Sequence, residues 1–167
     1  MASRLPSIWH QLDTAPERLV GLGFRCAMTC LRPGSNCTAL QSCALLNASI
    51  KAHRLPAKLN AEFTAWALAV DATAERPIEL SALEHPSFSS DESLAIALVA
   101  ACQHAHCPAL TACASALLGS HDLGRALAAT QILAHTLFTA NAVLHPRDST
   151  ELDPYAHFPS NPKLSVH

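Results

Sequence analysis

Two thiols and two imidazoles lie close together in one short segment of the chain, which reads Cys102-Gln-His104-Ala-His106-Cys107-Pro108. A thiolate attacks peroxides and disulfides, and a neighbouring imidazole can take up its proton. The Cys107-Pro108 pair predicts the first turn of a helix, where the helix dipole favours a negative charge. Cys107 is therefore the candidate nucleophile, with His104 and His106 as its candidate acid–base partners.

The spacing of the two cysteines decides which reactions this segment can support. Cys102 and Cys107 are five positions apart, which separates them by about 140° around a regular helix. A disulfide between them is not expected, because a helical pair has to share one face. The two thiols and two imidazoles are also soft ligands for zinc or copper, but their spacing matches no zinc finger and they cannot easily surround one ion. We expect no structural metal and no cofactor.

A longer segment carries a resemblance to a known family. From Glu92 to Thr111 the chain resembles the signature E-x11-C-x-H-C-x3-H of the alkylhydroperoxidase D and carboxymuconolactone decarboxylase superfamily. Glu92, His106 and Cys107 match that signature in register. His104 stands in place of its first cysteine, and Thr111 stands in place of its last histidine. The redox motif is therefore incomplete.

The resemblance covers roughly residues 89–145 and implies an all-α fold of the alkylhydroperoxidase D type, assembled as a homo-oligomer. In that family two cysteines reduce hydroperoxides through a disulfide, while a glutamate–histidine relay moves the protons. The relay brings Glu92 into the candidate site beside His104, His106 and Cys107. Because the cysteine pair is missing, we expect an antioxidant oxidoreductase that reduces hydroperoxides at Cys107 with an external thiol, or a protein that has lost this activity.

Two other functions stay open at this point. The other branch of the superfamily suggests a cofactor-free decarboxylase or isomerase of a small lactone or acid, with His106 as general acid and base. A non-catalytic helical oligomer is the third function, because the site residues also have structural interpretations. Glu92 follows Ser89 by three positions, as in a capping box, and a regular helix places it about 18 Å from His104. Five cysteines are expected as small core residues: Cys26, Cys30, Cys43, Cys102 and Cys113.

The composition limits the classes of partner. Hydrophobic residues make up 50% of the chain, charged residues make up 14%, and the net charge is −2. A nucleic-acid-binding surface needs a basic face, which the 11 scattered Lys and Arg residues do not provide. The apolar excess instead favours a homo-oligomer with the first or the sixth helix in its interface, and a small-molecule substrate is compatible with it.

The chain also gives an expectation for its compartment. Its longest apolar run, Leu94–Cys102, is much shorter than the roughly 20 residues that span a bilayer. The first ten residues lack the apolar segment of a secretory signal. We therefore expect a cytoplasmic protein outside the membrane, whose seven cysteines are thiols rather than structural disulfides.

Helices are predicted to position all of these residues. Capping residues, prolines and apolar periodicity predict six of them, over about 15–31, 36–53, 61–76, 90–103, 107–118 and 121–145. This pattern predicts one all-helical domain over residues 1–146, a bundle of about six helices. Prolines then forbid a long helix in the C-terminal tail, residues 147–167, which is expected to be extended.

A weak internal repeat suggests that the bundle has two related halves. Both halves begin with an acidic residue, Glu17 in the first and Glu92 in the second. The cysteines that follow at similar but unequal spacing are Cys26, Cys30 and Cys43 in the first half, and Cys102, Cys107 and Cys113 in the second.

Overall fold

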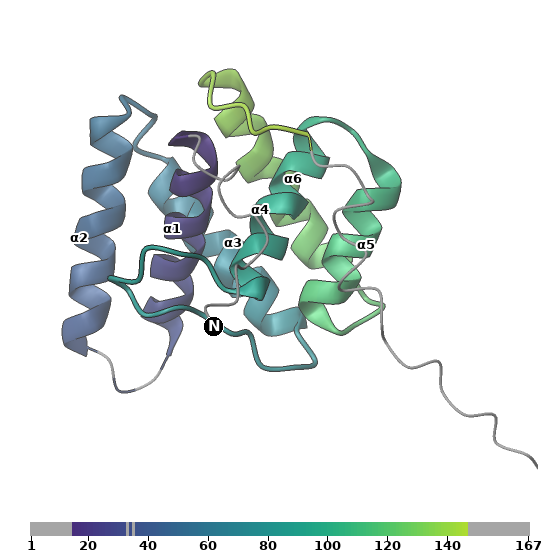
Figure 1. The fold of residues 1–167 in the computed structure, drawn as a ribbon, viewed down its shortest axis with the longest axis horizontal. Coiled ribbons are helices and arrows are strands. Elements are labelled where there is room, and N and C mark those ends of the chain that lie inside the picture. Colours follow the sequence, from purple (N-terminus) through teal and green to yellow (C-terminus); the bar gives the residue numbers. More distant parts are fainter. Residues whose placement is uncertain (1–14, 33, 35, 147–167) are drawn as a thin grey trace, which may run out of the picture.

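The computed structural model describes residues 15–32, 34 and 36–146, and within this part of the chain the regular structure is entirely helical (Figure 1). The helices are α1 (Ala15–Leu31), α2 (Asn36–Ala52), α3 (Leu59–Thr73), α4 (Ser90–Gln103), α5 (Cys107–Leu118) and α6 (Gly124–Thr139). The predicted all-α class and the bundle of six helices are confirmed. The predicted tail, residues 147–167, and the first 14 residues lie outside the described part.

Local capping explains where several helices begin and end. At the start of α4 the Ser89 side chain accepts the backbone N–H of Glu92, and the Glu92 side chain accepts that of Ser89, so the predicted capping box is confirmed. Helix α5 ends at Gly119, whose φ of 64° is in the left-handed region that glycine adopts at low cost. Helix α3 begins at Leu59, so Asn60 lies inside the helix and does not cap it.

The sixth helix is shorter than its apolar pattern predicts. It begins at Gly124 and ends at Thr139, several residues before the predicted end near position 145. Asn141 has a φ of 60°, and the backbone N–H of Ala142 donates to the carbonyl of Leu137 at 2.8 Å. This backward hydrogen bond is typical of helix C-termini in which a left-handed residue reverses the chain. The apolar residues after it therefore belong to a packed loop rather than to the helix.

The order in which the helices pack repeats in the two halves of the bundle. Helix α1 packs against α2 and α3, and α4 packs in the same way against α5 and α6 (Figure 1). The halves meet where α1 contacts α4 and where α3 contacts α6. Left-handed residues also lie at matching corners: Gly34 and Ala105 after the first helix of each half, Arg54 and Gly119 after the second. The two halves of the bundle thus share one packing order, in line with the weak sequence repeat.

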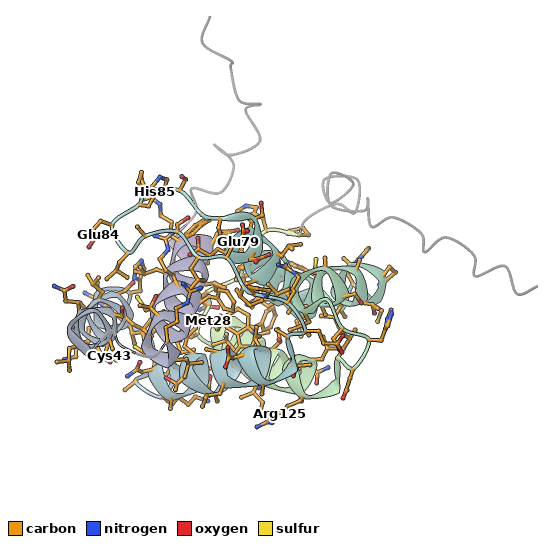
Figure 2. All side chains as sticks on the ribbon, turned by 90° about the horizontal axis from the view of Figure 1, so that it is seen from below. Met28, Cys43, Glu79, Glu84, His85 and Arg125 are labelled. Carbon is orange, nitrogen blue, oxygen red and sulfur yellow. The ribbon has the colours of Figure 1, made fainter. Side chains whose placement is uncertain are left out.

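Helix α4 lies in the middle of the core. Every residue from Asp91 to Ala101 is buried, as expected for a helix that is apolar on all sides. Aromatic residues of α1 and α3 fill the other half of the core, where the ring of Trp66 lies 5.0 Å from that of Phe24 and 6.3 Å from that of Phe63. Figure 2 shows the densely packed side chains between the helices.

The outer faces of the bundle carry several large apolar side chains. They are Leu40, Leu45, Leu68, Ile132, Phe138 and Val143. Helix α1, which was predicted as a possible interface helix, is instead mostly buried between α2, α3 and α4. Among the described residues, none of the helices has the length and apolar character needed to cross a lipid bilayer.

Candidate thiol site

Three of the four predicted site residues meet at the corner between α4 and α5. His104 ends α4, His106 caps the N-terminus of α5, and Cys107 is the first residue of α5. Ala105 between them has a φ of 52°, and this left-handed conformation reverses the chain within a few residues. All four side chains are exposed. The corner therefore presents one thiol and two imidazoles to solvent.

The two imidazoles already have structural partners. The Nε2 of His104 donates to the carbonyl of Leu144 at 2.8 Å, which fastens the segment after α6 to the end of α4. The Nδ1 of His106 accepts the backbone N–H of Ala109 at 3.2 Å and so caps α5. For His106 this leaves Nε2 as the ring nitrogen available for proton exchange at the surface.

The two cysteines near this corner lie in different environments. Cys107 is exposed, and its Sγ lies 3.9 Å from the carbonyl oxygen of Ala105. Cys102 is half-buried against the core, and this burial raises the pKa of its thiol. A raised pKa keeps Cys102 in the unreactive thiol form near neutral pH. Of these two cysteines, Cys107 is the one positioned to react with a molecule from solvent.

Glu92 lies at the opposite end of α4, away from the other predicted site residues. It occupies the first turn of α4 and His104 ends the same helix, so a rise of 1.5 Å per residue separates them by about 18 Å. The Glu92 side chain is completely buried and forms an ion pair with Arg25 of α1 at 2.7 Å. The structure therefore does not bring Glu92 together with His104, His106 and Cys107 in one chain.

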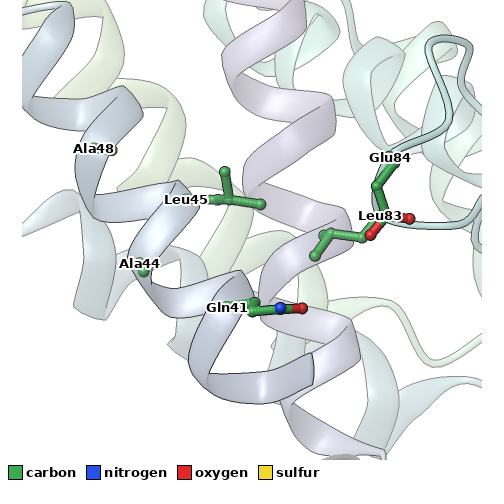
Figure 3. Close-up of a pocket in the computed structure, with 6 residues that line it drawn as sticks. All are labelled: Gln41, Ala44, Leu45, Ala48, Leu83 and Glu84. Carbon is green, nitrogen blue, oxygen red and sulfur yellow. The ribbon is translucent and has the colours of Figure 1, made fainter. Parts of the chain in front are cut away.

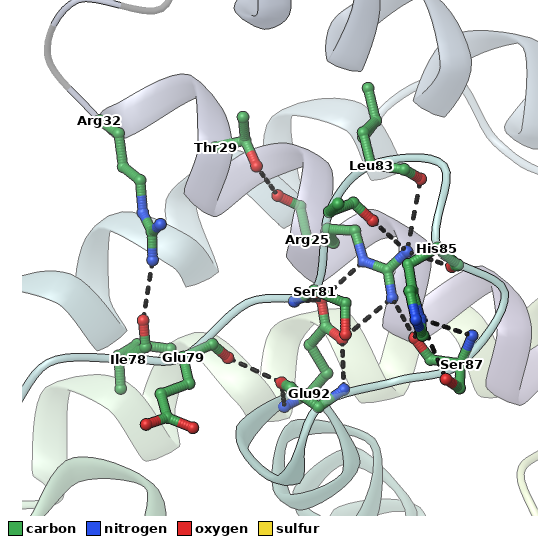
Figure 4. A network of polar contacts seen from close by, with 12 residues as sticks. Arg25, Thr29, Arg32, Ile78, Glu79, Ser81, Leu83, His85, Ser87 and Glu92 are labelled. Carbon is green, nitrogen blue, oxygen red and sulfur yellow. Dashed lines mark hydrogen bonds and ion pairs between the residues drawn. The ribbon is translucent and has the colours of Figure 1, made fainter.

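Both oxygens of the Glu92 carboxylate are fully engaged (Figure 4). Oε1 accepts from Arg25 Nε at 2.7 Å and from the Ser81 N–H at 3.3 Å. Oε2 accepts from Arg25 Nη2 at 3.0 Å and from the Ser89 N–H at 2.7 Å. Four donors on two oxygens hold the charge in place, because an unpaired buried carboxylate is very costly. The arrangement is that of a structural anchor rather than of a proton carrier.

Arg25 is the buried residue that the sequence analysis missed. Its guanidinium lies 5.3 Å from the centre of the Phe88 ring and donates to main-chain carbonyls of the connector between α3 and α4. These carbonyls belong to Ala82, His85 and Ser87. One signal was present in the sequence: Arg25 is a lone charge within the apolar stretch from Leu19 to Leu31. A buried arginine in such a stretch needs a carboxylate partner.

Each half of the bundle binds the loops after α3 and α6 through two side-chain hydrogen bonds at equivalent positions, which we call braces. The Oε1 of Glu17 in α1 accepts the N–H of His145 at 2.8 Å, as Glu92 in α4 accepts that of Ser81. At the other end of α1, Arg32 donates to the carbonyl of Ile78 at 2.8 Å, as His104 does to Leu144. The loop after α3 is therefore bound by Arg32 of its own half and by Glu92 of the other half. The loop after α6 is bound by His104 of its own half and by Glu17 of the other half. Glu92 corresponds to Glu17 and His104 corresponds to Arg32, so a structural role explains both residues without a role in catalysis.

The first half contains a thiol pair that the sequence analysis did not predict. Cys26 is buried as expected, but Cys30 is only half-buried and Cys43 is exposed, so the predicted core position of Cys43 is wrong. The Sγ atoms of Cys30 and Cys43 lie 3.4 Å apart, across the contact between α1 and α2. The signal available in the sequence was the Pro33-Gly34 pair, which predicts a turn between two consecutive helices.

A shallow groove lies on another side of α2 (Figure 3). It has a volume of about 500 Å³ and is lined by Gln41, Ala44, Leu45, Ala48, Leu83 and Glu84. Around a regular helix, Cys43 points away from these α2 residues, so the groove and the thiol pair are separate. Within the described part of the chain, no cluster of three or more His, Cys, Asp or Glu side chains is arranged to hold a metal ion.

Comparison of this chain with protein families, with curated proteins and with solved structures finds no match. The resemblance to the alkylhydroperoxidase D and carboxymuconolactone decarboxylase superfamily therefore depends on the motif residues alone and stays a prediction. Functional interpretation depends on the chemistry of the individual side chains.

Proposed function

We propose that the protein is a thiol-dependent hydroperoxide reductase that uses Cys107 as its single reacting thiol. The observation that carries the proposal is the exposure of Cys107 at the first turn of α5, at the same corner as the exposed His104 and His106, while Cys102 is partly covered. The first turn of a helix also offers unpaired backbone N–H groups and the positive end of the helix dipole, which attract anions. The match of His106 and Cys107 to the family signature points in the same direction.

The reaction needs two further thiol equivalents from outside the protein. The Cys107 thiolate attacks one peroxide oxygen, the O–O bond breaks, and the alkoxide that leaves takes up a proton to become an alcohol. Cys107 is then a sulfenic acid, which an external thiol converts to a mixed disulfide with release of water. A second external thiol attacks the mixed disulfide and restores the Cys107 thiolate.

The other residues of the site have limited roles in this proposal. His106 precedes Cys107 in the chain and offers Nε2 for proton exchange, since its Nδ1 caps α5. His104 and Glu92 act as positioning residues that hold the corner and the core through the Leu144 carbonyl and Arg25. A decarboxylase or isomerase would require His106 to face an enclosed substrate, whereas His106 is exposed.

The test is hydroperoxide consumption in the presence of dithiothreitol, compared between Cys107→Ser and the matched variant Cys43→Ser. Cys43 is also exposed, so both substitutions change an accessible thiol without disturbing the core. We expect Cys107→Ser to lower the rate by at least about tenfold and Cys43→Ser to leave it within about twofold. A wild-type protein that consumes no hydroperoxide, or a Cys107→Ser variant with the full rate, would contradict the proposal.

A non-catalytic helical oligomer is the second candidate, because two neighbouring helices expose large apolar side chains. Leu68 on α3 is 48% exposed, and Ile132 and Phe138 on α6 are 59% and 52% exposed. Helices α3 and α6 pack against each other, so these side chains fit an interface with a second copy of the chain. Light scattering at micromolar concentration should then give at least a dimer mass, and Ile132→Asp should lower it. A monomer mass for the wild type would remove this candidate.

A further inference from the structure

The Cys30–Cys43 pair has a geometry close to that of a disulfide. Cys30 lies in the last turn of α1 and Cys43 in the second turn of α2. Their Sγ atoms are 3.4 Å apart, and a disulfide bond of about 2.05 Å requires an approach of only about 1.4 Å. Cys43 is exposed, and Figure 2 shows it on α2 at a distance from the connector residues Glu84 and His85.

The two sulfurs differ in how easily a molecule from solvent can reach them. Cys43 is exposed, while Cys30 is half-buried and its Sγ lies 3.5 Å from the carbonyl oxygen of Ala39. Burial and the neighbouring Cys43 raise the pKa of Cys30 to about 11. Cys26, one turn earlier on α1, is completely buried, and its burial raises its pKa to about 12. Cys43 is therefore the entry point and Cys30 the second thiol.

We propose that Cys30 and Cys43 form a reversible disulfide site that exchanges with low-molecular-weight disulfides. The Cys43 thiolate attacks one sulfur of the external disulfide, which gives a mixed disulfide on Cys43 and releases one small thiolate. The Cys30 thiolate then attacks the Cys43 sulfur, closes the Cys30–Cys43 bond and releases the second small thiolate. Two electrons pass from the two cysteines to the external disulfide, and the two cysteine protons end on the released thiols.

The disulfide would link α2 to the core through α1. Helix α2 packs mainly on α1, with only a small contact with α3, and its outer face is exposed. A covalent link restricts the unfolded chain and so raises the melting temperature, by about 5–10 °C for a loop of this length. The site is separate from Cys107, so this inference does not depend on the proposed hydroperoxide reductase activity.

The experiment equilibrates the reduced full-length protein with glutathione disulfide, blocks the remaining thiols by alkylation and maps the cysteines by mass spectrometry. We expect a linked peptide pair that joins Cys30 to Cys43. Cys30→Ser should trap glutathione on Cys43, because the second thiol is missing, and Cys43→Ser should yield no linked peptide. Cys102→Ser is the matched control, half-buried at the corresponding corner of the second half, and should behave as the wild type.

The rate of the second step gives a separate readout. Because burial raises the pKa of Cys30, and this burial persists when Cys43 carries glutathione, closure of the disulfide should accelerate as the pH rises from about 7 to 9. Three results would overturn the inference: glutathione that stays on Cys43 in the wild type, a linked peptide that joins Cys43 to Cys37 instead, or no modification of Cys43. If Cys30→Ser does not fold, the peptide maps of the wild type and of Cys43→Ser still test the inference, because Cys43 is exposed.

Discussion

The α1–α2 corner and the α4–α5 corner occupy the same place in the two halves of the bundle, yet they present cysteine differently. In the first, Cys30 and Cys43 lie on two helices that face each other, with their sulfurs 3.4 Å apart. In the second, Cys102 is half-buried at the end of α4, while Cys107 is exposed at the start of α5. The first corner is suited to disulfide formation, and the second is suited to the reaction of a single thiol with an external partner.

The two halves also differ in how tightly their first-turn glutamates are held. Glu92 accepts four hydrogen bonds, two of them from the buried Arg25, whereas Glu17 uses one oxygen for His145 and its Oε2 has no hydrogen-bond partner among the described residues. Although Glu17 and Glu92 lie at similar positions in the two halves, they should therefore contribute differently to the free energy of unfolding. The comparison teaches that neighbours contributed by other helices, rather than residue type and spacing, decide what each side chain does.

The largest effect is expected for Glu92→Gln. This change removes the charge that neutralises Arg25 while keeping the shape of the side chain. Breaking one partner of a buried ion pair costs about 3–5 kcal/mol of unfolding free energy. Glu17→Gln should cost only about 1–2 kcal/mol, since it weakens hydrogen bonds to a single loop. Urea denaturation measures both, and equal losses in the two variants would break the proposed difference between the halves.

The next effect concerns the close contact between α1 and α3. A Cβ atom at Gly23 would lie 2.5 Å from the Phe63 ring, which is completely buried and cannot move aside easily. Gly23→Ala should therefore lower the unfolding free energy by about 1–3 kcal/mol. Gly124→Ala is the matched control, because no atom lies within 4 Å of the added group at the start of α6. A thermal or urea unfolding series in which Gly23→Ala is neutral would exclude this close packing.

A smaller effect appears at alkaline pH, again mainly in the first half. Burial raises the pKa of Cys26 from 9.0 to about 12. Between these values the unfolded chain loses the proton and the folded chain keeps it, so stability falls by roughly 1 kcal/mol per pH unit and is unaffected below about pH 9. Cys26→Ala should flatten this slope in urea unfolding between pH 9 and pH 10.5. If Cys26→Ala leaves the slope of unfolding free energy against pH unchanged, burial does not raise the pKa of Cys26.

The smallest effect tests the repeated braces. Arg32→Ala and His104→Ala each remove the hydrogen bond from a side chain to the loop that follows the third helix of its half. Loss of each of these hydrogen bonds should cost about 0.5–1.5 kcal/mol of unfolding free energy. Hydrogen exchange should then increase near Ile78 in the first variant and near Leu144 in the second. Increased exchange in the same loop for both variants would contradict the repeat.

Local signals in the sequence predicted much of the fold. The capping box of Ser89 and Glu92, the proline in the first turn of α5 and the glycine that ends it depend only on neighbouring residues. The end of α6 was missed because apolar residues continue past it, and the left-handed turn at Asn141 has no strong local signal.

The site was predicted less completely, because its contacts join distant parts of the chain. His104, His106 and Cys107 are close in sequence, so their shared corner could be predicted. The partner of Glu92 is Arg25, 67 positions earlier, and only the packing of α1 on α4 brings them together. The contact between Cys30 and Cys43 similarly depends on how α2 is rotated about its axis, which its weak apolar pattern does not specify.

Trapping of sulfenic acid tests the central claim, that the two corners carry different thiol chemistry, most directly. The reduced protein is treated with hydrogen peroxide below one equivalent in the presence of dimedone, which captures sulfenic acid, and every cysteine is mapped by mass spectrometry. The account predicts that the dimedone adduct forms first at Cys107, and that Cys30 and Cys43 become linked when glutathione disulfide replaces the peroxide. An adduct that forms first at Cys102, or a Cys107 that stays unmodified while other cysteines react, would contradict it.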